Sequence, residues 1–292
     1  MFESPTRRTA LAIAVTLVVG AGTAGCAEAQ RWQTISASRQ QQGGEKALDV
    51  EVEYGAGRLT VAPADRPLLY QFRLRYDESQ VTPLAEYDRQ TGALRLGVES
   101  RDGKRGIRAG RVREESRADV HLTRDVPLDL NLKFGAGEAD IDLGGLSLRR
   151  LHLATGATET RVAFRTPNRV PAEDVRLEAG AASFEVVGLG NARAQRFEFQ
   201  GGVGETVLDF SGAWDRNASA SVKMGIGSLT LRFPRDLGVR IVKDSFLTSF
   251  DGSGMVRRGG AYYSRNWASA RNRLTIQVSA ALGSIDIDWI DS

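Results

Sequence analysis

The chain has 292 residues, which suits one elongated domain or two ordinary ones. Its 39 lysines and arginines nearly balance 36 aspartates and glutamates, so the formal net charge is +3. A dedicated nucleic-acid binder needs a concentrated basic face, so we expect no nucleic-acid partner. One cysteine and two histidines exclude a disulfide scaffold and a cysteine/histidine zinc site, and we expect no metal and no cofactor.

Residues 1–25 have the pattern of a lipoprotein-type signal peptide. An arginine pair precedes an apolar run over 10–19, which is shorter than the ~20 residues of a membrane-spanning helix. The tetrapeptide TAGC, which ends at Cys26, resembles the lipobox of bacterial lipoproteins. This resemblance implies acylation of Cys26 and a membrane anchor in the outer membrane or at the cell surface. Cleavage after the AEA of residues 27–29, leaving a periplasmic or secreted protein, is the alternative.

Composition divides the rest of the chain. Residues 26–46 are mostly polar and lack a period, which predicts a flexible tether. We expect an N-terminal β segment over 47–134, interrupted by a basic loop at 99–117 that holds seven Lys/Arg and four Asp/Glu. A β-repeat segment follows over 135–292 and ends in a C-terminal cap.

Seven segments share one register: a small residue, an apolar or small residue, a second small residue, and then alternating apolar and polar residues. They are YGAGRLTV, FGAGEADIDL, TGATETRVAF, AGAASFEVV, GGVGETVLDF, MGIGSLTLRF and AALGSIDIDW. Period two with one apolar face is typical of a half-buried strand. Residues without a bulky side chain permit a bend with positive φ, or close stacking of one bend on the next. The predicted bend residues are Gly55, Gly57, Gly135, Gly137, Gly156, Gly180, Gly202, Gly204, Gly225, Gly227 and Gly283.

The spacing of the bends indicates the architecture. In the five central units, the second small positions are 21–24 residues apart. This period is typical of solenoids, in which each unit buries its apolar face by stacking on its neighbours. We therefore predict an all-β fold, a right-handed β-solenoid-like repeat array with glycine bends, after an N-terminal signal peptide. A meandering antiparallel sheet with hairpins at the glycine pairs stays the alternative.

Few residues point to catalysis. His121 and His152 lie in alternating stretches without a nearby cysteine, which favours imidazoles on the solvent face of strands over metal ligands. No Gly-x-Ser-x-Gly elbow or complete P-loop is present, so the sequence predicts no catalytic residues. Two carboxylate pairs have the i, i+2 spacing that glycoside chemistry or Ca²⁺ binding would use, although solvated outward positions explain them better. They are Asp140 with Asp142, and Asp286 with Asp288.

The stretch 235–272 mixes arginines with aromatic residues. Aromatic rings beside arginines can hold sugars. Terminal repeats of a solenoid also need an atypical cap, and we favour the cap. The residues concerned are Arg257, Arg258, Arg265, Phe246, Tyr262, Tyr263 and Trp267.

Four longer segments carry a family resemblance. VPLDLNLKFGAGEADIDLGGLSLRRLHLATGA, LEAGAASFEVVGLGNAR, GGVGETVLDFSGAW and MGIGSLTLRFP together resemble the bacterial toast-rack family. That family is related in pattern to adhesin domains and to the carboxy-terminal β-domain of cell-wall-active-antibiotic-response proteins. The resemblance covers residues 51–290 and implies a glycine-bent β architecture at the cell envelope, with no catalytic residues to carry over.

The expected function is that of a non-enzymatic, lipid-anchored protein of the cell envelope. It would act as an adhesin-like or scaffold surface for an envelope glycan or a protein partner. A carbohydrate-active β-helix enzyme that uses Asp140 and Asp142 is one alternative. An envelope-stress regulator that restrains a sensor kinase is the other.

Overall fold

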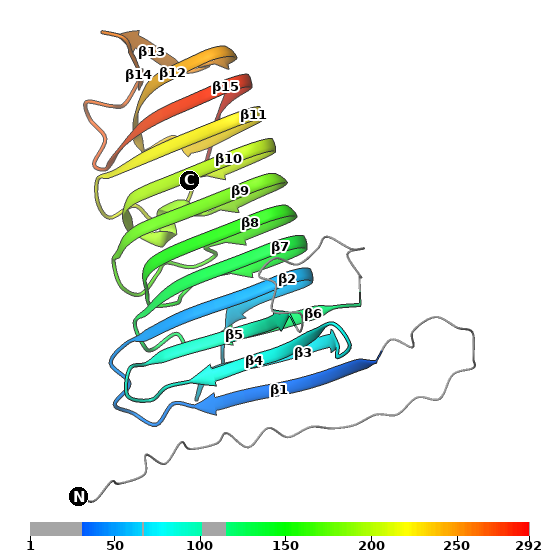
Figure 1. Cartoon of the computed structure of the whole chain (residues 1–292). Helices are drawn as coiled ribbons and strands as arrows, with labels where there is room; N and C mark the ends of the chain where they lie inside the picture. The colour runs from blue at the N-terminus through cyan, green and yellow to red at the C-terminus, as the bar shows by residue number, and fades with distance from the viewer. Residues whose placement is uncertain (1–30, 66, 101–114, 292) are drawn as a thin grey trace, which may run out of the picture.

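The computed structural model of the chain describes residues 31–65, 67–100 and 115–291. Strands dominate this part of the chain and join in one 15-stranded sheet (Figure 1), which confirms the all-β prediction. One short 3₁₀ helix, η1 Leu189–Ala192, lies among them. Within the described ranges, no helix has the length and hydropathy of a membrane span. The strands are β1 Trp32–Gln40, β2 Leu48–Pro63, β3 Leu68–Asp77, β4 Val81–Tyr87, β5 Ala93–Ser100, β6 Arg117–Leu122, β7 Leu128–Asp142, β8 Leu148–Ala163, β9 Ala172–Val187, β10 Ala194–Asp209, β11 Ala218–Pro234, β12 Gly238–Asp251, β13 Met255–Arg258, β14 Ala261–Ser264 and β15 Arg273–Ile290.

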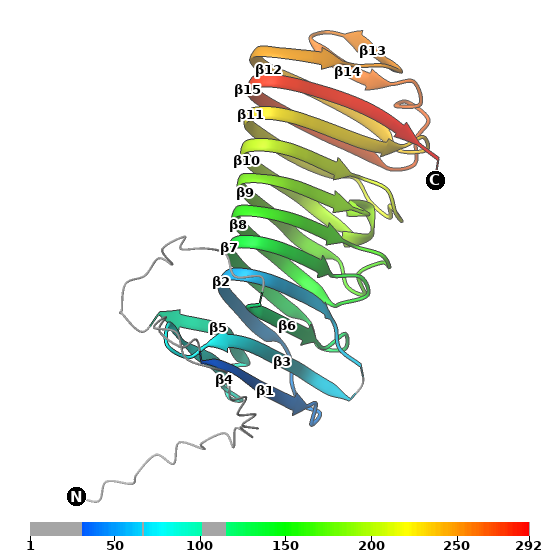
Figure 2. The ribbon, with the colours of Figure 1, turned by 90° about the vertical axis from the view of Figure 1, so that its right-hand side faces the viewer.

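The centre of the molecule is a stack of long parallel strands in the order β2, β7, β8, β9, β10, β11, β15, β12. Each of them bends sharply (Figures 1 and 2), and in all but β12 the small-residue pair identified in the sequence lies at the bend, so each strand has a first arm before this corner and a second arm after it. The turn at the end of each second arm leads to another strand, and we call one bent strand with its turn a coil. Because every strand continues through its bend and pairs in parallel, the hairpin alternative is wrong.

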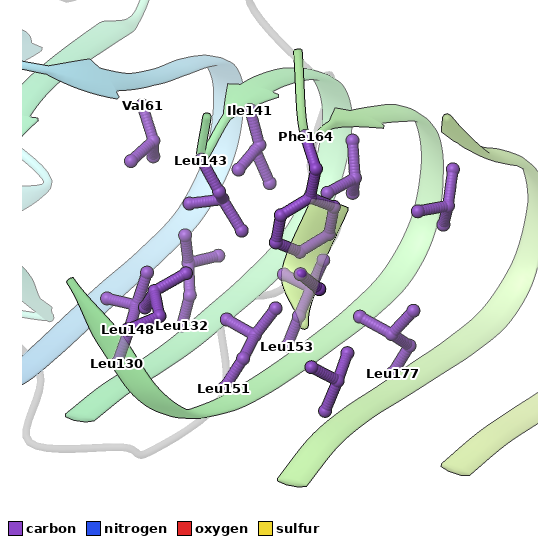
Figure 3. Close-up of a cluster of buried hydrophobic side chains, with 14 of the residues drawn as sticks. Val61, Leu130, Leu132, Ile141, Leu143, Leu148, Leu151, Leu153, Phe164 and Leu177 are labelled. Carbon is purple, nitrogen blue, oxygen red and sulfur yellow. The ribbon is translucent and has the colours of Figure 1, made fainter. Parts of the chain in front are cut away.

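The core lies between the two arms. Leu130 and Leu132 on the first arm of β7 and Ile141 on its second arm are at most 2% exposed. Figure 3 shows side chains of the first arms facing those of the second arms across the interior. Because side chains of a strand alternate between its two faces, every second residue of each arm points into the core. The inward side chains of one coil form one layer of the core and contact the layers of the coils on either side. Burial of one such leucine contributes about 1.5–3 kcal/mol.

The corners require glycine for two separate reasons. Gly137 has φ +118°, and a Cβ built on it would lie 2.0 Å from the backbone oxygen of Gly57 in the next coil. Gly135 lacks a positive φ, yet a Cβ built on it would lie 2.3 Å from the backbone oxygen of Gly55. Where glycine with a positive φ occupies the second small position, that position thus needs both conformational freedom and space, while the first needs space. In β8 and β9 the second position is taken by Thr158 and Ala182, so those corners do not require glycine there. Along the stack, the first positions hold Gly55, Gly135, Gly156, Gly180, Gly202 and Gly225, and the second hold Gly57, Gly137, Gly204, Gly227 and Gly283.

Asparagines join the turns at the edge opposite the corners. Asn168 is 1% exposed, and its Nδ2 donates to the carbonyl oxygen of Leu148 at 2.7 Å while its Oδ1 accepts from the Leu148 N–H at 2.9 Å. Asn191 donates from Nδ2 to the Phe164 oxygen at 2.8 Å and accepts from the Ala213 N–H at 2.8 Å. Each amide therefore satisfies backbone groups of neighbouring turns that have no ladder partner.

The N-terminal end departs from two predictions. Residues 32–40, expected within a flexible tether over 26–46, form β1, which pairs antiparallel with β3 and buries Ile35 and Ala37. The proposed boundary at 134/135 falls inside β7, because β2 and β7 pair in register and Tyr54 stacks on Phe134 at 5.9 Å. On its other side, β2 pairs with β5 along its first arm and with β6 along its second.

At the C-terminal end, the spatial order differs from the chain order. β15 lies between β11 and β12 and pairs in parallel with both. β12 is a further coil that the sequence pattern did not reveal, since Thr248 takes the position that aligns with Gly283. The hairpin of β13 and β14 lies beyond β12 at this end. The stack is solenoid-like but not strictly sequential, and its right-handed sense stays a prediction.

Candidate interaction surface

The outward residues of the first arms form rows across the coils, because parallel strands in register align every second residue. We call this surface the first-arm face. One row holds Asp49, Asp129, Arg150, Asp174, Arg196, Ser219 and Thr275. The next holds Glu51, Asn131, His152, Arg176, Glu198, Ser221 and Gln277. Charged residues predominate in the coils up to β10, with Asn131 and His152 among them, and hydroxyl and amide groups occupy β11 and β15.

Ion pairs between adjacent coils neutralise the charged part of this face. Arg150 Nη2 lies 2.6 Å from Asp129 Oδ2, and Arg176 Nη2 lies 2.6 Å from Glu198 Oε2. Each exposed pair contributes only ~0–1 kcal/mol to stability. Their larger consequence is electrostatic, because the face brings charges of both signs together across adjacent coils.

The arginines also keep carboxylates ionised. The hydrogen bond from Arg176 holds the pKa of Glu198 below its usual range, and a second hydrogen bond from Gln200 acts in the same direction. A general acid must hold its proton near the working pH, so a carboxyl group with a lowered pKa is poorly suited to that task at neutral pH. The arrangement suits hydrogen bonding and charge pairing with a ligand better than proton transfer.

A shallow groove crosses the first-arm face. One part has a volume of about 670 Å³ and runs from Arg150 past Arg176 to Gln277. A neighbouring part of about 400 Å³ lies toward β2 and shares Arg150, Asp174 and Arg176 with the first. The groove extends across several coils and bears donors and acceptors along its length. Its form suits an elongated polar ligand, in contrast to the concave, mostly apolar sites of small molecules.

The structure keeps the predicted carboxylate pairs apart. Asp140 and Asp142 lie on β7 and Asp286 and Asp288 on β15, which is five strand steps or ~24 Å away. Asp142 accepts the Gly144 N–H at 2.9 Å. Among the described residues, no group of three or more His, Cys, Asp or Glu is arranged to hold a metal ion.

The two histidines do not meet either. His152 lies on the first-arm face, with its Nε2 3.3 Å from Glu178 Oε1. His121 lies on β6, where it alternates with buried Val120 and Leu122. Cys26, the signal peptide 1–25 and most of the basic loop, 101–114, lie outside the described residues.

The aromatic residues of 235–272 pack at the β12 end. Tyr262 lies 4.6 Å from the ring of Phe250, and both rings pack against the core. Tyr263 makes an edge contact with Trp267 and accepts a hydrogen bond from Arg240 Nε at 3.1 Å. These aromatic rings therefore pack against one another and against the core at this end of the stack.

The sequence pattern did not identify the first-arm face. Arg176 and Glu198 are 22 residues apart, and they meet because one coil has about that length. The repeat period, applied to the polar positions as well as to the glycines, was the signal that would have aligned them.

The chain matches a known family model. The N-terminal domain of toast_rack matches residues 27–187 and 167–232, which together span more than half of the chain. Overlapping matches are expected for a repetitive array. No curated protein is similar to the chain in sequence.

Solved structures show a distant likeness. A "putative cell adhesion protein" from Clostridium sporogenes aligns with a TM-score of 0.44 and 16% identity over 89% of this chain and 100% of its own. A "putative adhesin" from Bacteroides fragilis aligns with a TM-score of 0.32 and 10% identity over 88% and 97%. Another "putative adhesin", from Parabacteroides distasonis, has a TM-score of 0.30 and 8% identity over 89% and 98%.

Proposed function

Because the chain belongs to the toast-rack family, we propose that it is a non-enzymatic binding protein of the cell envelope, adhesin-like in that it holds its partner on an extended sheet surface. The observation that carries this proposal is the first-arm face. It combines ion pairs between coils with a groove that runs over several strands. A surface of aligned polar rows on a stack of coils is a form that repeat proteins use for extended ligands.

The partner we favour is an envelope glycan. Hydroxyl and amide side chains on β11 and β15, such as Ser221 and Gln277, offer both donors and acceptors to a polyhydroxylated polymer. Arg150 and Arg176 add donors that reach acidic groups on such a polymer. A protein that presents a polar segment is the other class of partner in this proposal.

We also propose that the protein is held to a membrane through an acylated Cys26, on the outer membrane or cell surface. The lipobox-like TAGC and the apolar run before it support this anchor. β1 begins at Trp32, so only five residues, 27–31, with a reach of ~20 Å from Cys26 to Trp32, would separate the anchor from the sheet. Labelling of the expressed protein with radioactive palmitate should therefore be lost on Cys26→Ser.

Two matched double variants test the binding surface. Ser221→Arg with Thr275→Arg places two large cations in the groove, and Ser228→Arg with Thr230→Arg places the same groups on outward positions of a second arm. We expect purified residues 27–292 to co-sediment with insoluble envelope polysaccharide. The first pair should lower the bound fraction at least tenfold and the second should leave it unchanged. Equal loss in both pairs, or release of reducing sugar by the unaltered protein, would contradict the proposal.

A further inference from the structure

The middle residue of each corner points outward, and in four adjacent coils it is a large exposed aliphatic residue. Val203, Ile226, Leu282 and Leu247 are 54%, 48%, 46% and 63% exposed. Val203 pairs in register with Ile226, Ile226 with Leu282, and Leu282 with Leu247, so the four side chains form one continuous line. We call this line the corner row. Among the described residues, Val256 is the one other large hydrophobic residue with comparable exposure.

The fold does not require large side chains in the corner row. The same position holds alanine in the other coils, namely Ala56, Ala136, Ala157 and Ala181. The strands also bend at those corners (Figures 1 and 2), so a methyl group is sufficient at the middle position. Small residues on either side of Val203, Ile226 and Leu282, such as Gly225 and Gly227 around Ile226, leave these three side chains unshielded. Large apolar residues that are exposed together and are not needed for packing mark a contact surface.

The shape of the corner row favours a bilayer as the occupant. The row lies on the convex side of the corners, where the strands turn back (Figures 1 and 2), and a shallow hollow of about 440 Å³ that includes Met224, Gly225 and Ala281 lies beside it on the first-arm side. Four half-exposed aliphatic side chains also provide far less than the ~800 Å² that each partner buries in a stable protein complex. Apolar side chains on a convex edge can instead enter the boundary between headgroups and acyl chains, which needs no shape complementarity.

The residues beside the row fit the same occupant. On the second-arm side, Ser228, Ser284 and Ser249 flank the row in three adjacent coils, and Glu205 takes the same position in the coil of Val203. Hydroxyl groups hydrogen-bond to headgroups of any charge. Since charged residues do not dominate this edge, contact with it should depend on the apolar row and only weakly on salt.

The position of the row along the stack sets the orientation. In sheet order, β10 lies seven steps and β12 ten steps from β1, which corresponds to ~34 and ~48 Å at ~4.8 Å per step. The chain from Cys26 to Trp32, with five residues between them, reaches only ~20 Å. A stack that stands upright on its anchor would hold the row away from the bilayer, whereas a stack that lies on its corner edge brings row and anchor to the same surface.

We propose that the corner row is a membrane-contact edge and that the protein lies on its side on the bilayer that holds its lipid. This proposal rests on the proposed acylation of Cys26. In this orientation the first-arm face stands at an angle to the membrane, with its groove open to an envelope polymer alongside.

The test uses the single thiol of the chain. Residues 26–292 are coupled through Cys26 to maleimide-headgroup lipid in phosphatidylcholine vesicles that contain a photoreactive acyl chain, and crosslinked peptides are identified. We expect crosslinks at the peptides that carry the corner row, unchanged in 0.5 M salt. In the variant Val203→Ser/Ile226→Ser/Leu282→Ser, the crosslinking yield at these peptides should fall roughly thirty-fold or more, as expected for the loss of three half-exposed aliphatic side chains. The control variant Ala136→Ser/Ala157→Ser/Ala181→Ser, which alters the same corner position in three other coils, should leave the crosslinking yield unchanged.

Two outcomes would overturn the proposal. Crosslinks that avoid the corner row, or that persist in the aliphatic-to-serine variant with an unchanged thermal midpoint, would show that the edge does not touch lipid. Sedimentation of the unaltered chain as a dimer that the same variant converts to a monomer would assign the row to self-association. Because the tether is made chemically, either result leaves the acylation of Cys26 to be decided by palmitate labelling.

Discussion

Replacement of Gly227 by alanine should test the corner geometry most directly. Gly227 has φ +142°, and a Cβ built on it would lie 1.8 Å from the backbone oxygen of Gly204 in the neighbouring coil. A side chain at positive φ costs about 1–2 kcal/mol, and a steric clash that shifts packed backbone costs about 1–3 kcal/mol. Gly227→Ala should therefore lower the free energy of unfolding by roughly 2–5 kcal/mol, a large part of the ~5–15 kcal/mol of a typical domain.

Ile226→Ala, one residue earlier in the same corner, is the matched control. Its side chain is 48% exposed and alanine occupies this position in other coils, so we expect a loss of about 0.5 kcal/mol or less. Urea unfolding followed by far-ultraviolet circular dichroism measures both variants. If Gly227→Ala unfolded at the same urea concentration as the unaltered protein, neighbouring corners could not be as close as the structure has them.

Four other variants test the turns and two shifted pKa values. Asn168→Ala should lower the free energy of unfolding, measured in urea, by about 2–4 kcal/mol, because buried backbone groups lose their hydrogen-bond partners. An Asn168→Asp variant as stable as the unaltered protein would contradict this explanation. Burial raises the pKa of Tyr54 to about 12, so the folded state keeps a proton that the unfolded chain releases near pH 10. The free energy of unfolding should therefore fall as pH rises from 10 to 12. The Tyr54→Phe variant should lose less stability over that interval than the unaltered protein. The hydrogen bond from Arg216 lowers the pKa of Asp215 to about 2, so its contribution is present above pH ~4 and lost as pH falls toward 2. With a third of that side chain exposed, Asp215→Asn should remove less than ~1 kcal/mol at pH 7 and flatten the acid limb of the stability curve.

Local patterns predicted the strands and their bends. Alternation with period two and small residues at the bends are properties of one coil, and they act over a few residues. Seven of the corners could therefore be placed before any long-range contact was known. The coil in β12 was missed because Thr248 stands where glycine was the signal. β1 was missed because Ile35 and Ala37 offer too few apolar residues to stand out from their polar surroundings.

The interaction surfaces depend on which coils are neighbours. Arg176 meets Glu198 because β9 and β10 are adjacent and in register. The corner row is continuous because β15 lies between β11 and β12, which brings Leu282 next to both Ile226 and Leu247. In chain order, Leu247 would follow Ile226 directly.

The amino-acid sequence by itself determined that this chain forms bent, one-sided strands, since backbone conformation and side-chain alternation are decided within each strand. Tertiary structure alone decided their order, the ion pairs of the first-arm face and the line of exposed aliphatic residues. The physical reason is that all coils share one pattern and are compatible as neighbours, so pairing between distant segments and the filling of the common core select the arrangement.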